Sequence, residues 1–305
     1  MAELTKESFK RVEPGRFDSD SIARPTVTYW QDAWRRLKKN PIAMFSLVLL
    51  FLCLLMVIFA PSLRGLDYIS INSKTKYLEP NSTYWFGTDN LGRDLFSRVW
   101  VGARVSLIVA MACTVIQIVV GCAYGGIMAY FGGIVDEIMM RIVEIITSMP
   151  SMLITLLIMM VLDKSLGALL LAMCITSWCG TARQMRGMIM QLRESEYVMA
   201  AETLGAKPSR IIVKHLLPNT LSILILNVAS SIPRYIFSEA SLSFLGMGLD
   251  SNQISLGVLI SNGQAALDLY PHLLIWPAVV LCIIVLAFNL LGDGLRDALD
   301  PKLRQ

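Results

Sequence analysis

The chain has 305 residues, of which 55% are hydrophobic and 16% charged, and its formal net charge is +4. A soluble domain carries about a quarter of charged residues, so this composition excludes an ordinary soluble protein and indicates an integral membrane protein. The basic residues gather at the ends of apolar runs and form no aromatic-interleaved patch, which argues against nucleic acid as a partner.

Six apolar stretches are long enough to cross a bilayer, since a helical crossing takes about 20 apolar residues. They lie at 42–60, 104–128, 138–162, 165–182, 218–243 and 271–292. The runs are continuous and do not alternate, which favours helices over a barrel. The sequence therefore predicts an all-α integral membrane protein with six transmembrane helices. Pro150, Pro233 and Pro277 lie inside spans, and each is expected to permit a kink.

The lysine and arginine residues near the span ends predict the orientation. Basic residues precede the first span and recur between the fourth and fifth spans, whereas the loop 245–270 has none. Both termini are therefore expected in the cytoplasm. The predicted organisation is a cytoplasmic tail at 1–40, a first transmembrane helix at 41–61, an extracytoplasmic loop with a small ordered cap at 62–100, a five-helix core at 101–292 with a cytoplasmic loop at 183–217, and a cytoplasmic tail at 293–305.

Charged residues at membrane depth are functional candidates by default. Glu239, beside three serines in the fifth span, faces either the interior of the bundle or a translocation path, and the sequence favours neither. A second group of charges begins the third span, at Asp136, Glu137, Arg141 and Glu144. Glu137 and Arg141 have the favourable acid-first spacing for a helical ion pair. For Arg141 and Glu144 a structural salt bridge is favoured over a place on the path.

No motif for catalysis or metal binding is found in the sequence. It has no phosphate-binding loop and no paired-histidine spacing, and its six cysteines lie in apolar runs without CxxC spacing. The chain is therefore predicted to hold no metal or cofactor and to have no catalytic residue. An intramembrane enzyme that uses Glu239 or the charges at 136–144 as acid and base is the remote alternative. If ATP drives this protein, the ATPase is another chain.

The polar stretch RESEYVMAAETLGAKPSRIIVKHLLPN at 193–219 is the most informative segment. It predicts a short helix capped by Ser195. The residues expected to face inward are Val198, Ala201 and Leu204. Gly205 suits the left-handed position just beyond the end of this helix. An alanine face lets another backbone come close, so the segment is expected to be a short, stiff knob offered to a partner.

This stretch resembles the cytoplasmic coupling motif of ABC-transporter permeases, which reads EAA, three residues, Gly, nine residues, then I-x-L-P. The residues in register are Ala200, Ala201, Gly205, Leu217 and Pro218. Met199 stands where the motif has Glu, and His215 where it has Ile. Three further segments, FGTDNLGRDLFSRVWVGARVSL, SEASLSFLGMGL and AFNLLGDGLRDALDPKLR, resemble the C-type permease subunit of oligopeptide and dipeptide importers. With YFGGIVDEIMMRIVEIITSMPSML they cover most of residues 85–305.

The resemblance implies a type I ABC importer permease in a bacterial cytoplasmic membrane. It implies a homologous second permease, two ATPase subunits that bind ATP and Mg, and an extracytoplasmic solute-binding protein. ATP-driven closure of the ATPases would be transmitted through the 195–206 helix. The coupling residues would be Met199, Ala200, Ala201, Gly205, Leu217 and Pro218. The implied solute is a peptide, with nickel or another small solute as the alternative. Nickel favours imidazole ligands, and His272, at an outer edge, is the only histidine of the spans.

Overall fold

The computed structural model describes residues 29–63, 65, 68–162, 164–207, 210–249 and 253–299. The distal parts of both predicted tails, 1–28 and 300–305, lie outside the described residues. Within the described ranges the regular elements are all helices, and the only β-type pairing there is an isolated bridge between Thr88 and Asp94. The all-α prediction is confirmed.

Five helices are long and apolar enough to cross a membrane. They are α2 (Pro41–Leu63), α3 (Leu95–Phe131), α6 (Leu166–Arg193), α9 (Leu217–Phe244) and α11 (His272–Leu299). The predicted third span is instead divided into α4 (Gly133–Thr147) and α5 (Ser151–Val161), which meet at an angle of 76°. The six predicted spans therefore correspond to five continuous helices and one bent pair.

The bend between α4 and α5 lies at Pro150, which has an extended ψ of 126° and precedes the first residue of α5. Proline lacks the N–H that would continue the helical ladder, and it disfavours helical conformation in the residue before it. The expected kink is therefore a complete break at this proline. Pro233 and Pro277, by contrast, lie inside the continuous helices α9 and α11.

Three helices extend beyond the predicted spans. α3 begins at Leu95, where the side chain of Asp94 accepts a hydrogen bond from the Ser97 amide at 2.8 Å. α6 continues to Arg193 and α11 to Leu299. The segments 95–100, 183–193 and 293–299, which the sequence placed in loops and in a tail, are helical. Hydropathy marks the apolar part of a helix, whereas a helix ends where its backbone is capped or turned.

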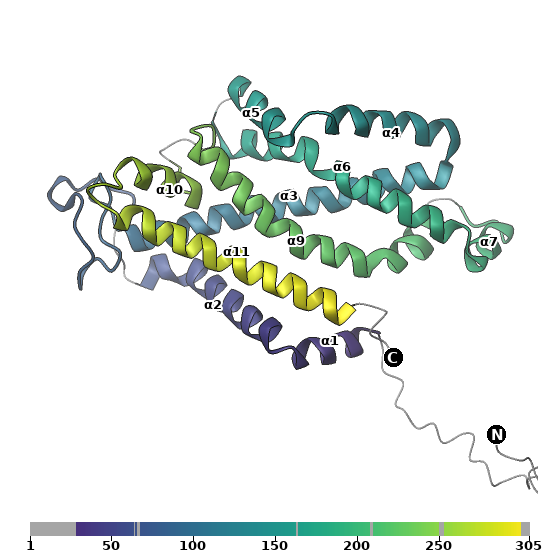
Figure 1. Ribbon diagram of the computed structural model, residues 1–305, viewed down its shortest axis with the longest axis horizontal. Helices are drawn as coiled ribbons and strands as arrows, with labels where there is room; N and C mark the ends of the chain where they lie inside the picture. Colours follow the sequence, from purple (N-terminus) through teal and green to yellow (C-terminus); the bar gives the residue numbers. More distant parts are fainter. Residues whose placement is uncertain are drawn as a thin grey trace, which may run out of the picture.

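The long helices lie side by side along the longest axis of the molecule (Figure 1). α3 packs between α6 and α9, while α11 packs against α2, α9 and the short α10 (Leu256–Ala265). Close approach of α3 to α6 depends on glycine, because a Cβ added at Gly121 would lie 2.7 Å from the Cβ of Thr181. Small residues at such crossings are typical of membrane helices.

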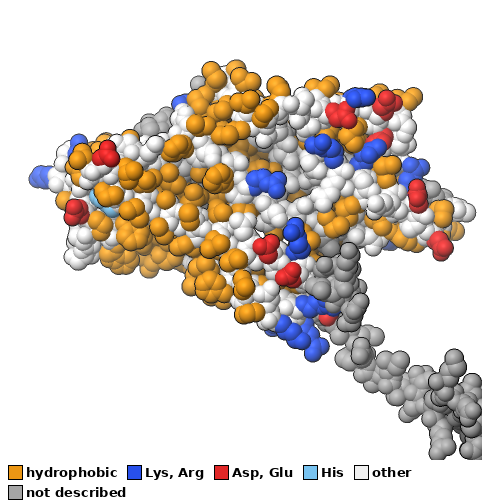
Figure 2. Space-filling model, viewed as in Figure 1, with side chains coloured by type: hydrophobic (Ala, Val, Ile, Leu, Met, Phe, Trp, Pro, Cys, Tyr) orange, Lys and Arg blue, Asp and Glu red, His pale blue; other side chains and the backbone are white. Residues whose placement is uncertain are grey.

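The predicted tail at 1–40 contains a helix, α1 (Tyr29–Lys39), which precedes α2 and contacts α11. At the opposite end of the bundle, the loop between α2 and α3 forms a small cap that includes the turn η2 (Ser73–Thr75). Phe86 of the cap stacks on Trp276 of α11 at 4.2 Å between ring centroids. Figure 2 shows hydrophobic side chains over much of the visible face between two charged ends, as expected of a protein that contacts lipid.

Candidate coupling surface and translocation face

The short helix α7 (Glu196–Thr203) projects at the end of the bundle away from the cap (Figure 1). Val198 anchors it, since this side chain is fully buried in a small apolar cluster. The cluster draws residues from α3, α6, α9 and the π-helical segment η3 (Ile211–Leu216), among them Cys122, Ile189, Ile211, Leu216 and Leu224. One buried valine thus fixes a mostly exposed helix to the body of the protein.

The end of α7 has the predicted left-handed glycine. Gly205 has a φ of +78°, and the amide of Ala206 donates to the carbonyl of Ala201 at 3.1 Å. This bond runs from the third residue after Thr203 back to the last turn of α7, as in a Schellman motif. A Cβ added at Gly205 would meet nothing within 4 Å. The backbone conformation, and not a lack of space, therefore selects glycine here.

The predicted cap at the beginning of α7 is wrong. The Ser195 hydroxyl donates to the carbonyl of Leu192 in the last turn of α6. The backbone carbonyl of Ser195, not its side chain, accepts from the amides of Val198 and Met199, at 3.0 and 3.1 Å. Only two residues, Glu194 and Ser195, connect α6 to α7, and the serine side chain caps the end of α6, not the beginning of α7.

The outer face of α7 differs from the prediction at one residue. Leu204, expected to face inward, is 87% exposed. A helix advances by about 100° per residue, so six residues place Leu204 about 120° away from Val198. Met199 and Ala200 are also exposed, whereas Ala201 is half-buried. The exposed face therefore consists of the apolar side chains of Met199, Ala200 and Leu204, of which alanine is small, and it does not pack on the core of this chain.

The remaining motif residues lie at the beginning of α9. Leu217 is its first residue, and Pro218 follows in its first turn. Asn219 donates from Nδ2 to the Tyr197 hydroxyl at 3.0 Å, which ties α7 to α9. The side chain of His215, which replaces the Ile of the motif, lies outside the described residues. The structure thus brings the two halves of the motif together around α7.

Glu239 on α9 is completely buried among serine hydroxyls. One carboxylate oxygen accepts from Ser106 of α3 at 2.7 Å. The other accepts from Ser243 at 3.0 Å and from Ser255 at 2.7 Å. Of the three neighbouring serines in the sequence, Ser243 is the one that bonds to it. The other two partners come from distant segments, so no local signal predicts them.

Two of these serines also connect Glu239 to α10. Ser255 caps α10 by accepting from the Val258 amide at 3.2 Å, and Ser106 accepts from the Leu256 amide at 3.3 Å. Because each hydroxyl oxygen accepts from a backbone N–H, its proton remains available for the carboxylate. The N-terminal end of a helix also favours negative charge. The carboxylate therefore links α3, α9 and the first turn of α10.

Arg141 and Glu144 do not join this cluster. They form an ion pair of 2.8 Å with each other on α4, where their side chains are 71% and 49% exposed. The predicted pair of Glu137 with Arg141 is wrong, because Arg141 reaches the acid three residues ahead. Asp136 instead forms a two-bond ion pair with Arg186 of α6. The partly buried pair of Asp136 and Arg186 holds α4 on α6, whereas the pair of Arg141 and Glu144 lies on the exposed surface of α4.

A hydroxyl-lined hollow of about 370 Å³ lies between α5, α6 and α9. Its polar lining includes Ser151, Thr176, Ser177, Arg234, Ser238 and Ser241. Arg234 had no predicted role, although an arginine inside a span is a signal in itself. Its neighbour Tyr235 faces inward and donates to Gln117 at 2.7 Å.

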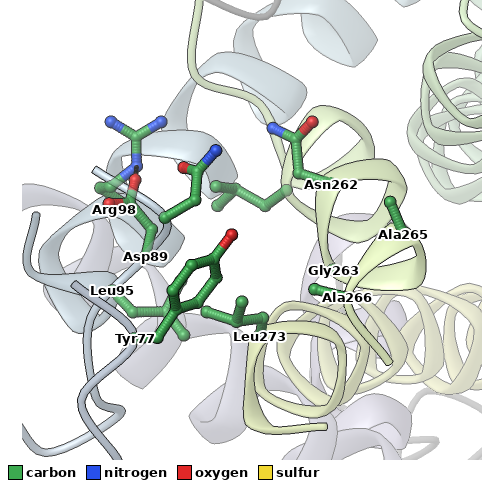
Figure 3. Close-up of a pocket in the computed structure, with 11 residues that line it drawn as sticks. Tyr77, Asp89, Leu95, Arg98, Asn262, Gly263, Ala265, Ala266 and Leu273 are labelled. Carbon is green, nitrogen blue, oxygen red and sulfur yellow. Dashed lines mark ion pairs between the residues drawn. The ribbon is translucent and has the colours of Figure 1, made fainter. Parts of the chain in front are cut away.

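A smaller cavity of about 200 Å³ separates the cap from α10 (Figure 3). Asp89 lies at its wall and pairs with Arg93 at 2.7 Å and with the buried Arg98 at 3.3 Å. The Tyr77 ring extends from the cap toward α10, where Asn262 lines the opposite side. Two arginines share the carboxylate of Asp89, and these ion pairs fasten the cap to the beginning of α3.

Two family models match the chain. The first, "Binding-protein-dependent transport system inner membrane component", matches residues 117–305. This chain belongs to that family. The second, "N-terminal TM domain of oligopeptide transport permease C", matches residues 28–80. Membership makes the chain a multi-pass membrane component of a transport system, so the alternative of an intramembrane enzyme is set aside.

Curated relatives cover the whole length. The oligopeptide transport system permease protein OppC of Bacillus subtilis is 42% identical over 305 residues, which is all of both chains. The dipeptide transport system permease protein DppC of the same organism is 43% identical over 289 residues, covering 94% of this chain and 90% of the relative. The Escherichia coli K12 OppC is 39% identical over 277 residues, 90% of this chain and 92% of that one.

A solved structure supports the fold. The MetNI methionine ABC transporter, in an inward-facing conformation, contains a chain that matches with a TM-score of 0.51 at 19% identity. The match covers 67% of this chain and 95% of that chain. At this identity the likeness concerns the fold alone, and it confirms the predicted type I importer permease architecture.

Proposed function

We propose that this chain is the transmembrane permease subunit of an ATP-driven importer of oligopeptides or dipeptides. The observation that carries the proposal is α7, a short helix with an exposed face of Met199 and Ala200, anchored by Val198 and ended by Gly205. Such a stiff projection suits docking into a partner. The names of the curated relatives support peptides over nickel as the solute. The described residues also contain no group of three side chains suited to holding a metal ion.

In this proposal α7 transmits the movement of an ATPase to the bundle. Two ATPase subunits bind ATP and Mg, and one of them contacts the exposed face around Met199, Ala200 and Leu204. Since α7 is bonded to α9 through Tyr197 and Asn219 and packs on α6 through Val198, a displacement of α7 moves both long helices. Ala201 and Leu217 lie at the joint between α7 and α9, and Pro218 follows Leu217 in the first turn of α9. The solute path then opens alternately to the two sides.

The complex is proposed to contain a homologous second permease and an extracytoplasmic solute-binding protein, in a bacterial cytoplasmic membrane. The basic residues around 183–217 favour a cytoplasmic position for α7 and for both termini, with the cap of loop 62–100 outside. A topology reporter joined after Glu194 is expected to be active inside, and one joined after Lys76 outside. An inside signal from the Lys76 fusion contradicts this orientation.

The charged candidates receive separate roles. Glu239 serves as a structural anchor for α10, because serine hydroxyls of three segments donate hydrogen bonds to its two carboxylate oxygens. Arg141 and Glu144 serve as surface charges on α4, since they satisfy each other and are exposed. The path itself is proposed to run along the hollow between α5, α6 and α9.

Co-purification and uptake test the proposed function. The tagged chain, expressed with the other genes of its operon, is isolated from membranes and reconstituted in vesicles with its solute-binding protein. We expect two ATPase subunits in the complex, ATP hydrolysis stimulated by the loaded binding protein, and ATP-dependent uptake of labelled tripeptides. A complex that transports nickel and no peptide, or a chain that transports alone, contradicts the proposal.

A further inference from the structure

One face of α9 is polar between Ser230 and Ser241, beside the exposed ring of Phe237. Arg234 is exposed in the second half of this helix. Ser230 lies four residues before it, and Ser238 and Ser241 lie four and seven residues after it, on the same face. A face in contact with lipid is apolar, and an arginine at membrane depth is costly unless it meets water or a polar partner. This face is therefore turned away from lipid.

Arg234 is unsatisfied within the described part of the chain, where it forms no ion pair and no hydrogen bond. It lines the hollow of about 370 Å³, whose described lining contains no carboxylate to neutralise it. Arg104, by contrast, donates to the carbonyl of Val57 at 2.7 Å, and Arg186 pairs with Asp136. Arg183 of α6 also has no bonded partner among the described residues, but it does not line the hollow. Arg234 is therefore the unpaired charge of the hollow.

Several hydroxyls of the hollow are also uncommitted. The hydroxyl of Ser241 bonds to a carbonyl of its own helix, and that of Ser177 does the same on α6. Those of Ser151, Thr176 and Ser238 have no hydrogen-bond partner among the described residues. The hollow therefore offers one guanidinium and three free hydroxyl groups, from three helices, beside the exposed apolar side chains of Met152 and Phe237. This combination suits a small anion joined to variable apolar groups.

We propose that Arg234 binds a carboxylate of the peptide as it passes through the path. A guanidinium pairs with a carboxylate through two parallel hydrogen bonds. Moving a carboxylate out of water costs free energy, and a fixed positive charge lowers that cost. The charge does so without recognising the side chains of the peptide. This inference rests on the proposed peptide import, and it adds a substrate-binding residue to it.

The carboxylate has two sources, the C-terminus of the peptide or an acidic side chain. Tripeptides Ala-Gln-Ala, Ala-Glu-Ala and Ala-Lys-Ala, all with free C-termini, distinguish them in vesicles that contain the complete importer. Uptake is measured for the wild type and for Arg234→Gln, Arg234→Lys and Arg234→Glu. Arg296→Gln, which removes an exposed cation of α11 outside the hollow, is the matched control. ATP hydrolysis stimulated by the loaded binding protein reports assembly and coupling.

We expect Arg234→Gln to lower uptake about fivefold at unchanged stimulated ATP hydrolysis, with partial rescue in Arg234→Lys and no effect of Arg296→Gln. An equal fall for the three peptides identifies the C-terminal carboxylate. A larger fall for Ala-Glu-Ala, with Ala-Lys-Ala favoured by Arg234→Glu, identifies the side chain.

Two results overturn the assignment of Arg234. In the first, uptake of all three peptides is unchanged in Arg234→Gln. In the second, uptake, ATP hydrolysis and recovered complex fall together, which means that Arg234 pairs with an acidic residue of the second permease. Failure of the proposed function is distinct, because wild-type vesicles then take up none of the peptides.

Discussion

The two ends of α9 depend on contacts of different range in the sequence. At the beginning of α9, the shape of α7 depends on contacts between residues close in sequence, such as the bond from Ala206 to Ala201 and the left-handed Gly205. Toward the other end, Glu239 depends on Ser106, which is 133 residues away, and on Ser255. The comparison teaches that the exposed docking helix is specified locally, whereas the buried charge is specified by the packing of three segments.

The largest effect is expected for the buried carboxylate. Glu239→Ala leaves the hydroxyls of Ser106 and Ser255 without their acceptor and opens a cavity, so we expect a loss of about 3 kcal/mol in the free energy of unfolding. Thermal unfolding of the purified complex, followed by size-exclusion chromatography, detects this loss as a lower unfolding temperature. Glu239→Gln keeps the volume and one acceptor oxygen and is the matched variant, with a smaller loss. Equal stability of Glu239→Ala and the wild type contradicts the anchoring role.

A smaller and more local effect is expected at Gly205. Gly205→Val strains the left-handed backbone by about 2 kcal/mol. Because α7 contributes little to the core, the chain is expected to insert normally while stimulated ATP hydrolysis and uptake are lost. Both are measured in vesicles and normalised to the chain recovered.

Gly205→Asn is the control for the backbone argument at this position, since asparagine tolerates positive φ and the site has room for a side chain. It is expected to retain most of the activity. If the asparagine variant loses as much activity as the valine variant, contact of glycine with the partner, and not its φ, is what matters.

Removal of one hydroxyl from the Glu239 cluster is expected to cost less than removal of the carboxylate. Ser255→Ala loses both the bond to Glu239 and the cap of α10, for about 1 kcal/mol. Ser241→Ala is its matched control, because that hydroxyl bonds only to the carbonyl of Phe237 in its own helix. The same thermal assay compares them. If Ser241→Ala lowers thermal stability as much as Ser255→Ala, the hydrogen bonds of the Glu239 cluster contribute no more than a bond within one helix.

The smallest effect is expected at Arg141. Its ion pair with Glu144 is exposed, and exposed pairs contribute about 0.5 kcal/mol or less. Arg141→Gln should therefore leave thermal stability and peptide uptake near the wild-type values. A severalfold fall in uptake at normal stability places Arg141 on the path, and the distinction drawn between surface charges and the face of α9 then needs revision.

The sequence by itself determined the class of the protein, the apolar part of each span and the end of α7. These depend on composition, on runs of about 20 apolar residues, and on a glycine whose conformation needs no distant partner. The apolar runs of α6 and α11 end before the helices do, because polar residues that follow an apolar run continue the same helix. The sequence also assigned Ser195 to the wrong helix, since two helices compete for one short connection.

Only the tertiary structure decided where the charges lie. Glu239 and Arg234 are five residues apart on α9, yet the first is buried among hydroxyls and the second is exposed in the hollow. Five residues advance a helix by about 500°, which turns the two side chains to different faces, but the sequence does not say which face meets α3 and α10. That choice depends on helices that come together in space and are distant in sequence. The location of a membrane charge, buried or facing a path, is therefore a property of packing.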